Sequence, residues 1–270
     1  SSSTGTSTTA SATELNVSVG VPPLNGLDPA LAGRGPFTTY LTPAYEPLVR
    51  VTADGTLTPA LATAWEVSDD GLTLKLTIRD DAKFSDGSDV DAAAVAASIE
   101  YWKAANGPFA NQLENMVSAV ATGDYEVTVT NSVPFPNMIY LFQSNWLAGD
   151  IMSPAAVANP ALMKTGTYGA GPYVLDEAQT VSDTTYVYVP NENYYDQDAI
   201  GFDKVTVTVN SDPNSAIQAL KTGQTNLMLS DAVTANANAA TIGEGINIVT
   251  EPGTNWFGLV LIDRDGSTNP

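Results

Sequence analysis

Alternating apolar and polar residues predict a β-strand near the start of the chain. Leu15, Val17 and Val19 are separated by polar or small residues, which is the period of a strand with one buried face. The alternation stops at Val-Pro-Pro, 21–23, and residues 24–37 are rich in Gly and Pro. We therefore expect a strand that begins near residue 14 and is followed by a loop.

Two β-hairpins are the clearest local elements. Apolar residues alternate over 65–78 on both sides of Asp-Asp-Gly at 69–71. A second alternating segment spans 116–129 and contains Gly-Asp at 123–124. Gly between two alternating runs favours a hairpin because it accepts a positive φ. These segments therefore predict antiparallel strands in the middle of the chain.

An amphipathic helix is predicted after the first hairpin. Ser88 or Asp89 can cap its start, and Asn-Gly-Pro at 106–108 is typical of a helix end. Its apolar residues recur at the i, i+4, i+7 spacing of one helix face. They are Val95, Ile99 and Trp102.

The last third of the chain alternates predicted strands and helices. One helix runs from its cap Asp212 to Gly223, with Pro213 at the first helical position. The other elements expected in the chain are strands at 184–189, 204–209, 226–229, 246–250 and 256–261, and helical segments at 38–48, 137–142 and 232–240. Hairpins in the middle and a β-α-β order at the end predict one α/β unit that carries an inserted antiparallel subdomain.

Composition limits the chemistry available to the chain. Its 270 residues include 10 Lys plus Arg and 30 Asp plus Glu but no His or Cys, which gives a formal charge of −20. These residues cannot form a His-based catalytic triad, a zinc site with N or S ligands, or a disulfide. The acidic charge also argues against nucleic acid as a partner. No apolar run approaches the ~18–20 residues of a membrane helix.

Three polar motifs invite a chemical interpretation, but a structural one is favoured for each. Gly-Ala-Gly-Pro-Tyr at 169–173 lacks the Lys of a phosphate loop and predicts a close backbone approach instead. Acidic residues at 69–70, 80–81 and 86–91 fall in predicted turns and caps, although paired carboxylates also serve hydrolases. Asp-Arg-Asp-Gly at 263–266 lacks the later ligands of a calcium loop. No metal site is predicted.

Two tryptophans are candidate ligand-binding residues. Trp146 lies between Gln-Ser-Asn and Leu-Ala-Gly, and Trp256 follows Gly-Thr-Asn. A Trp in a loop or at a strand start can offer a ligand a flat apolar face and one N–H donor. Packing in the core or in an interface stays open for both residues.

Several segments together resemble the family-5 extracellular solute-binding proteins of ABC importers, the oligopeptide, dipeptide and nickel binders. The matching segments in the first half are Leu-Asp-Pro at 27–29, Tyr-Glu-Pro-Leu-Val at 45–49, the hairpin at 59–73, Arg-Asp-Asp-Ala-Lys-Phe-Ser-Asp-Gly at 79–87 and the helix start at 89–95. Those in the second half are Gly-Ala-Gly-Pro-Tyr-Val-Leu at 169–175, Asn-Glu-Asn-Tyr-Tyr at 191–195 and 214–227, where Asn226 replaces an acidic residue. Their order and spacing make the resemblance specific.

The resemblance implies an α/β fold of the type II periplasmic-binding-protein kind. We expect a flexible Ser/Thr-rich linker at 1–13, a lobe I α/β unit formed by 14–45 and 165–270, and an inserted, mainly antiparallel β-rich subdomain at 46–164. The second lobe of the family is expected to be absent from these residues. The linker is similar to the tether that follows a lipidated Cys, so we expect any targeting segment and the anchor to precede Ser1.

The resemblance also implies the function of a substrate-binding component rather than an enzyme. Such a protein captures peptides outside the membrane and delivers them to an ABC permease, as a monomer and without a cofactor. It is extracellular, lipid-anchored at a Gram-positive cell surface, or periplasmic. The residues expected to contact an oligopeptide or other small solute are Asn25, Leu27, Tyr40, Trp146 and Trp256.

Three other functions stay open at this point. An oligosaccharide binder on the same scaffold would use the same stacking tryptophans. A secreted hydrolase would need two carboxylates facing each other across a cleft. A surface adhesion module would need no transporter. Because the groups that fix ligand termini in relatives lie mostly in the second lobe, we expect residues 1–270 alone to bind ligand weakly or not at all.

Overall fold

The computed structural model describes residues 13–229 and 246–249. Residues 13–229 belong to one compact unit, and residues 246–249 belong to a second. Everything below concerns the first unit unless stated. No helix among the described residues is long and apolar enough to span a membrane.

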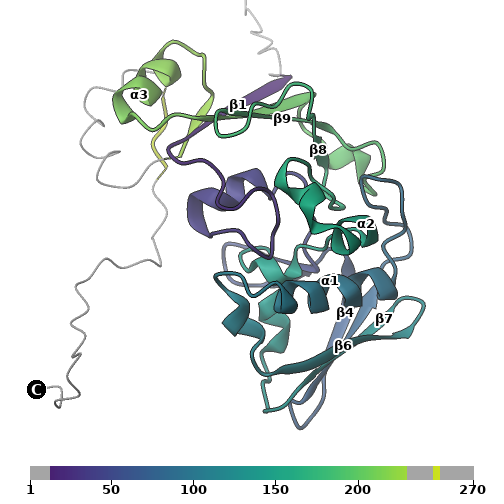
Figure 1. Ribbon diagram of the computed structural model, residues 1–270. Coiled ribbons are helices and arrows are strands. Elements are labelled where there is room, and N and C mark those ends of the chain that lie inside the picture. Colours follow the sequence, from purple (N-terminus) through teal and green to yellow (C-terminus); the bar gives the residue numbers. More distant parts are fainter. Residues whose placement is uncertain (1–12, 230–245, 250–270) are drawn as a thin grey trace, which may run out of the picture. The chain divides into compact units, whose positions relative to one another are not determined.

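A five-stranded sheet contains the predicted N-terminal strand (Figure 1). Its order is β11 (Leu227–Met228), β1 (Glu14–Val19), β10 (Lys204–Val209), β9 (Thr185–Pro190) and β8 (Tyr173–Leu175). Strand β1 lies parallel to β10 and β11, whereas β9 is antiparallel to both of its neighbours. The strands expected at 184–189 and 204–209 are therefore confirmed. The strand expected at 226–229 is limited to two residues.

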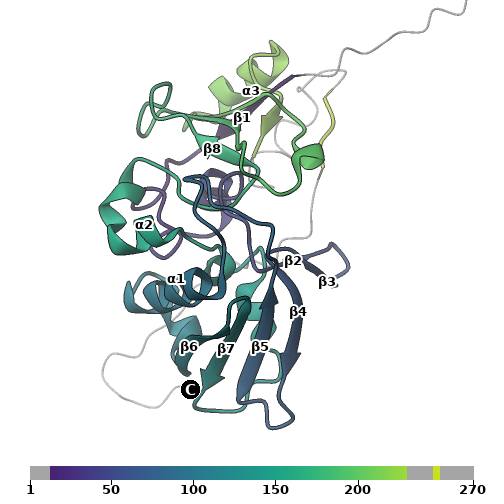
Figure 2. The same ribbon diagram turned by 90° about the vertical axis from the view of Figure 1, so that its right-hand side faces the viewer.

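The two predicted hairpins form a second, four-stranded antiparallel sheet (Figure 2). Its order is β4 (Ala62–Val67), β5 (Thr73–Ile78), β7 (Glu126–Asn131) and β6 (Met116–Gly123). Leu74, Leu76, Val127 and Val129 are buried, because helix α1 (Ala92–Ala104) packs against β6 and β7. Gly71 has a φ of +68° at the tip of the first hairpin, which confirms the role predicted for it.

Helix α1 begins later than the sequence predicts. Its N-cap is Asp91, whose carboxylate accepts a hydrogen bond from the Ala94 N–H at 2.8 Å. The expected caps Ser88 and Asp89 are wrong because the chain is still extended there. Asp89 lies in a β-bridge opposite Lys83, and their side chains form an ion pair.

Helix α1 ends at the predicted Asn-Gly-Pro sequence, but Asn106 and Gly107 have different roles from those expected of a helix end. Asn106, rather than Gly107, takes the left-handed conformation, with a φ of +52°. At Gly107 an added Cβ would lie 1.9 Å from the Ala30 carbonyl oxygen. Gly107 is therefore needed for close packing against another segment.

The prediction of a helix at 38–48 is wrong after Tyr40. A 3-10 helix, η1, spans Gly35–Tyr40, and turns continue to residue 44. The carbonyl oxygens of Pro43 and Ala44 accept hydrogen bonds from Tyr173 and Gly171, so a distant segment occupies the acceptors that a longer helix would use. A local pattern cannot anticipate this competition.

The remaining elements are short. The helix predicted after Asp212 is confirmed as α3 (Pro213–Lys221), and the segment at 137–142 is a 3-10 helix, η3 (Met138–Phe142). The other elements are β2 (Val49–Val51), β3 (Leu57–Pro59), α2 (Pro154–Ala158), η2 (Ala110–Leu113), η4 (Leu147–Gly149), η5 (Pro160–Lys164) and η6 (Gln197–Ala199).

Three expected elements lie beyond the first unit. The helix at 232–240 and the strand at 256–261 fall outside the described residues. Of the strand expected at 246–250, residues 246–249 have no regular secondary structure. The strands of the five-stranded sheet come from the ranges assigned to lobe I, and those of the four-stranded sheet from the inserted subdomain. The exact domain boundaries stay a prediction.

Candidate ligand-binding site

A pocket of about 310 Å³ lies between strand β2, the loop before it, and loop residues that are distant in the sequence. Its lining comes from residues 42–51, from Ser144 and Asp150, and from Pro172. It is called the Glu46 pocket below, after the carboxylate with the most polar contacts. Because it contains buried charged side chains, it is the best candidate for binding a polar solute among the described pockets.

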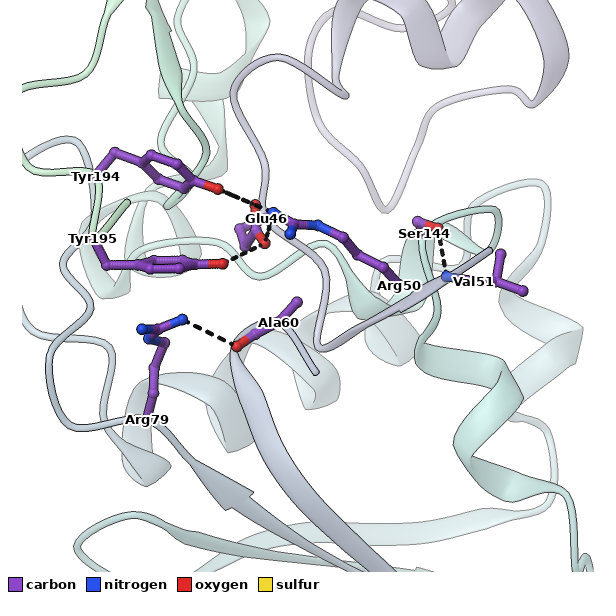
Figure 3. Close-up of polar contacts among 8 residues, drawn as sticks. All are labelled: Glu46, Arg50, Val51, Ala60, Arg79, Ser144, Tyr194 and Tyr195. Carbon is purple, nitrogen blue, oxygen red and sulfur yellow. Dashed lines mark hydrogen bonds and ion pairs between the residues drawn. The ribbon is translucent and has the colours of Figure 1, made fainter. Parts of the chain in front are cut away.

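Glu46 is the acceptor of a buried polar network (Figure 3). Its side chain is 3% exposed and forms an ion pair with Arg50. The Tyr195 hydroxyl donates to Glu46 Oε1 at 2.9 Å, and the Tyr194 hydroxyl donates to Oε2 at 3.3 Å. Burial raises the pKa of Glu46, while Arg50 and the two tyrosines oppose that rise. Both carboxylate oxygens are therefore engaged by protein donors.

The local sequence explains how Glu46 is held. Pro47 follows it, and a residue before Pro is restricted to extended backbone. The Glu46 carbonyl accepts from the Ile151 N–H at 3.4 Å, and the Leu48 N–H donates to the Gly149 carbonyl at 3.0 Å. The chain then enters β2, which carries Arg50 four residues after Glu46.

The two tyrosines come from the Asn-Glu-Asn-Tyr-Tyr segment, which Asn191 folds into a turn. Asn191 is buried, donates from Nδ2 to the Gly171 carbonyl at 2.8 Å, and accepts from the Asn193 N–H at 3.0 Å. The Tyr194 N–H donates to the Asn191 carbonyl at 3.1 Å. This turn directs both phenol hydroxyls toward Glu46 (Figure 3).

Arg79 covers the ring of Tyr195. Its guanidinium carbon lies 3.3 Å from the Tyr195 ring centroid, and its Nε and Nη2 pair with Asp81 at 2.5 and 3.0 Å. A cation over an aromatic face is attracted by the ring quadrupole. The network therefore joins three segments that carry the family resemblance, at 45–49, 79–87 and 191–195.

The Gly-Ala-Gly-Pro-Tyr segment lets the chain pass close to residue 44, as predicted. The Gly171 N–H donates to the Ala44 carbonyl at 2.9 Å. A Cβ on Gly169 would lie 2.3 Å from the Ala44 carbonyl oxygen, and one on Gly171 would lie 2.5 Å from the Ala44 carbonyl carbon. Only glycine fits at these contacts, so the segment has a packing role.

Asp150 brings a second carboxylate to the pocket. It follows η4 and is 5% exposed. Burial, and then the nearby charge of Glu46, raise the pKa of Asp150 well above its ordinary value. Sequence reasoning missed this residue because nothing in its local context of small residues marks it as a pocket side chain.

The predicted site residues lie elsewhere in the fold. The exposed Asn25 donates from Nδ2 to the Leu31 carbonyl at 3.0 Å. Leu27 and Tyr40 are fully buried, and the Tyr40 hydroxyl donates to the Val21 carbonyl at 2.6 Å. Trp256 is outside the described residues. None of the described four, Trp146 included, lines the Glu46 pocket, and their ligand contacts stay a prediction.

Trp146 is half-buried and contacts a cation. The Arg34 guanidinium lies between two rings, 3.8 Å from the Trp146 centroid and 4.4 Å from that of Phe109. This cation–π contact gives Trp146 a packing role, which is the alternative that the sequence left open.

Five acidic residues of the predicted turns and caps have structural partners. Asp70 accepts from the Leu72 N–H at 3.0 Å, Asp86 from the Ser88 N–H at 3.0 Å, and Asp91 caps α1. Asp81 and Asp89 pair with Arg79 and Lys83. Within 13–229 and 246–249, no group of three or more acidic side chains is placed to hold a metal ion.

The family follows from comparison with known proteins. The model for bacterial extracellular solute-binding proteins, family 5 (middle part), matches residues 56–265. The chain therefore belongs to this family, as its motifs imply. The nickel-binding periplasmic protein of Escherichia coli K12 is 32% identical over 192 residues, which cover 68% of this chain and 35% of that protein.

Two further relatives cover more of the chain. The probable D,D-dipeptide-binding periplasmic protein of E. coli K12 is 29% identical over 262 residues, covering 90% of this chain and 48% of that protein. A structure of the unliganded, open form of the periplasmic murein tripeptide-binding protein MppA matches 86% of this chain and 48% of its own, with a TM-score of 0.76 and 25% identity. The fold is therefore periplasmic-binding-protein-like, and the chain spans about half or less of these relatives.

Proposed function

We propose that the chain belongs to the substrate-binding component of an ABC importer, which captures peptides or other small solutes outside the membrane and delivers them to a permease. Family membership carries this proposal. The relatives named above bind nickel, a D,D-dipeptide and a murein tripeptide. The Glu46 pocket supplies the buried polar and charged groups that orient a small solute.

Family membership favours binding over catalysis, and the partners of Glu46 agree with it. A general acid or base must be free to exchange a proton with substrate, but Arg50, Tyr194 and Tyr195 all engage the Glu46 carboxylate. Among the acids in the predicted turns, Asp70 and Asp86 accept from backbone amides and Asp81 pairs with Arg79. We therefore propose a protein that binds its solute without changing it.

We also propose a location outside the cytoplasmic membrane, with a lipid anchor upstream of Ser1. Two relatives are named as periplasmic proteins. The Ser/Thr/Gly composition of residues 1–12 suits a flexible tether. Labelling of cells with radioactive palmitate, followed by capture of this protein, tests the anchor. Absence of label from the captured protein would contradict it.

The binding function is tested by a thermal-shift screen of the full-length protein. The panel contains tripeptides, dipeptides, a nickel chelate, and neutral oligosaccharides of two to six sugars. Calorimetry of each compound that raises the unfolding temperature gives its affinity. We expect a peptide to bind most tightly, and selective binding of an oligosaccharide would replace the peptide by a sugar as the solute.

A further inference from the structure

A second pocket, of about 300 Å³, lies at the end of the four-stranded sheet where β6 begins and β7 ends. Its lining comes from η2, from these two strand ends and from residues 133–135 after β7. It shares no lining residue with the Glu46 pocket. It is called the amide pocket below, after the four side-chain amides that line it, those of Asn111, Gln112, Asn115 and Asn131.

Two of these amides are buried without a hydrogen-bond partner. Gln112 Oε1 is buried and accepts no hydrogen bond within the part of the chain that the structure describes. Asn131 is 6% exposed, and its side chain makes no hydrogen bond to a residue of 13–229 or 246–249. By contrast, the buried amides of Gln143 and Asn191 are both hydrogen-bonded. Because an unpaired buried polar group costs free energy, a ligand that pairs with Gln112 and Asn131 is favoured.

Hydrogen bonds hold the main chain around these amides. The Phe135 N–H donates to the Gly71 carbonyl at 2.7 Å, and the Ser132 N–H donates to the Asn115 carbonyl at 2.8 Å. The segment after β7 is therefore fixed to the first hairpin and to the start of β6. A fixed frame lowers the entropy that is lost when a site orders around its ligand.

The residues that line the pocket favour a neutral ligand with hydroxyl groups. Glu114 is the only ionisable residue among them, so the pocket repels anions. Side-chain amides offer both N–H donors and carbonyl acceptors, and a hydroxyl group is likewise both donor and acceptor. Phe135 is half-buried and adds an apolar wall. A sugar ring has this combination, with hydroxyl groups at its rim and C–H groups on its faces.

We propose that the amide pocket binds a neutral monosaccharide unit, at a site separate from the one that captures the solute. The sugar hydroxyls pair with Gln112 Oε1 and with the Asn131 amide, and a C–H face of the ring packs on Phe135. A volume of about 300 Å³ is at the lower end for ligand pockets, which suits one sugar ring better than an extended chain. This inference goes beyond the proposed function, because it requires neither a second lobe nor a permease.

Calorimetry on the full-length protein tests the site. The probes are the methyl glycosides of glucose, galactose, mannose and N-acetylglucosamine. N-acetyl-alanine methylamide is included as a neutral peptide that also offers donors and acceptors. We expect at least one glycoside to bind with a Kd in the millimolar range or tighter, as a few net hydrogen bonds allow, and to bind more tightly than the peptide.

Two substitutions locate the bound sugar. Gln112→Met and Asn131→Leu keep most of the side-chain volume but remove the polar atoms, and each should weaken binding about fivefold or more. Asn214→Leu is the matched control, because it removes an exposed amide from helix α3, and it should leave the affinity unchanged. Circular dichroism checks that the variants fold. If Asn131→Leu does not fold, Gln112→Met still decides the question.

Each of four results would overturn the inference. They are the absence of millimolar binding by every glycoside, unchanged affinity in the pocket variants that fold, an equal loss in Asn214→Leu, and binding of the peptide in place of the glycosides. None of these results bears on solute capture at the Glu46 pocket, so the proposed function stands or falls separately.

Discussion

Two carboxylates in one pocket show how a side chain's partners decide its role. Glu46 is surrounded by Arg50, Tyr194 and Tyr195 and is satisfied within the protein. Asp150 is equally buried but has no donor among the residues described. The carboxylate of Glu46 is therefore satisfied by protein donors, whereas that of Asp150 bears the full cost of its burial.

Asp150 should make the free protein less stable as pH rises. Its pKa is raised in the folded state, so the folded protein holds this proton more tightly than the unfolded chain does. The stability it contributes is present below the unfolded pKa of about 3.9 and is lost as pH rises through the raised value. We expect Asp150→Asn to be more stable at neutral pH, by about 1 kcal/mol or more, because the amide avoids burying an unpaired charge.

Urea unfolding of the natural chain, Asp150→Asn and the control Asp69→Asn, which removes an exposed charge, between pH 4 and pH 8 measures this effect. Only Asp150→Asn should change the slope of unfolding free energy against pH. Parallel curves for all three proteins would contradict the assignment.

At the level of elements, the sequence predicts correctly those elements that are stabilised by contacts between residues close together in the chain. The hairpins at 65–78 and 116–129 were predictable because alternation and turn residues lie within a few positions of each other. The helix expected at 38–48 was not, because Gly171 and Tyr173 occupy the carbonyls of residues 43–44. The site was hidden for the same reason: Tyr194 and Glu46 are 148 positions apart.

The start of α1 can be tested by alanine substitution. Asp91→Ala removes the cap of the Ala94 N–H and is expected to lower the unfolding free energy by about 0.5–2 kcal/mol. Asp89→Ala removes only an exposed ion pair with Lys83, which is expected to change stability by less than about 1 kcal/mol. Denaturant unfolding of both variants gives the comparison. A larger loss in Asp89→Ala would place the helix start where the sequence first suggested.

The close contact between Gly171 and the backbone of Ala44 can be tested separately. A Cβ on Gly171 would meet the Ala44 backbone at 2.5 Å, so Gly171→Ala must displace backbone and should cost about 1–3 kcal/mol. Gly201→Ala is the control, because an added Cβ there has nothing within 4 Å. Equal denaturation midpoints for the two variants would show that the segment yields without strain.

At the scale of the whole molecule, the proposed function requires residues 13–229 to provide one wall of a binding site. The chain covers 35% and 48% of the two curated relatives described above, and family members of this fold close around their ligand by movement about a hinge. Contacts to both lobes are needed to favour a closed state.

Residues 1–270 by themselves are therefore expected to bind trialanine weakly or not at all. Calorimetry of this chain beside the full-length protein makes the comparison. Micromolar binding by residues 1–270 alone would contradict it and would place the complete site within this chain.

The burial of Asp150 would couple the binding of any cation beside this carboxyl to the release of a proton. Where pH is near the raised pKa of this carboxyl, part of the free protein is protonated at Asp150. A cation bound beside it would favour the carboxylate, so the proton would leave as the cation enters and affinity would rise with pH. Glu46, Arg50 and Tyr45 are the other ionisable groups that line the pocket, and Glu46 is already paired. Binding enthalpies should therefore differ between phosphate and Tris buffers, whose heats of ionisation are unequal, and equal enthalpies would show that no proton is exchanged.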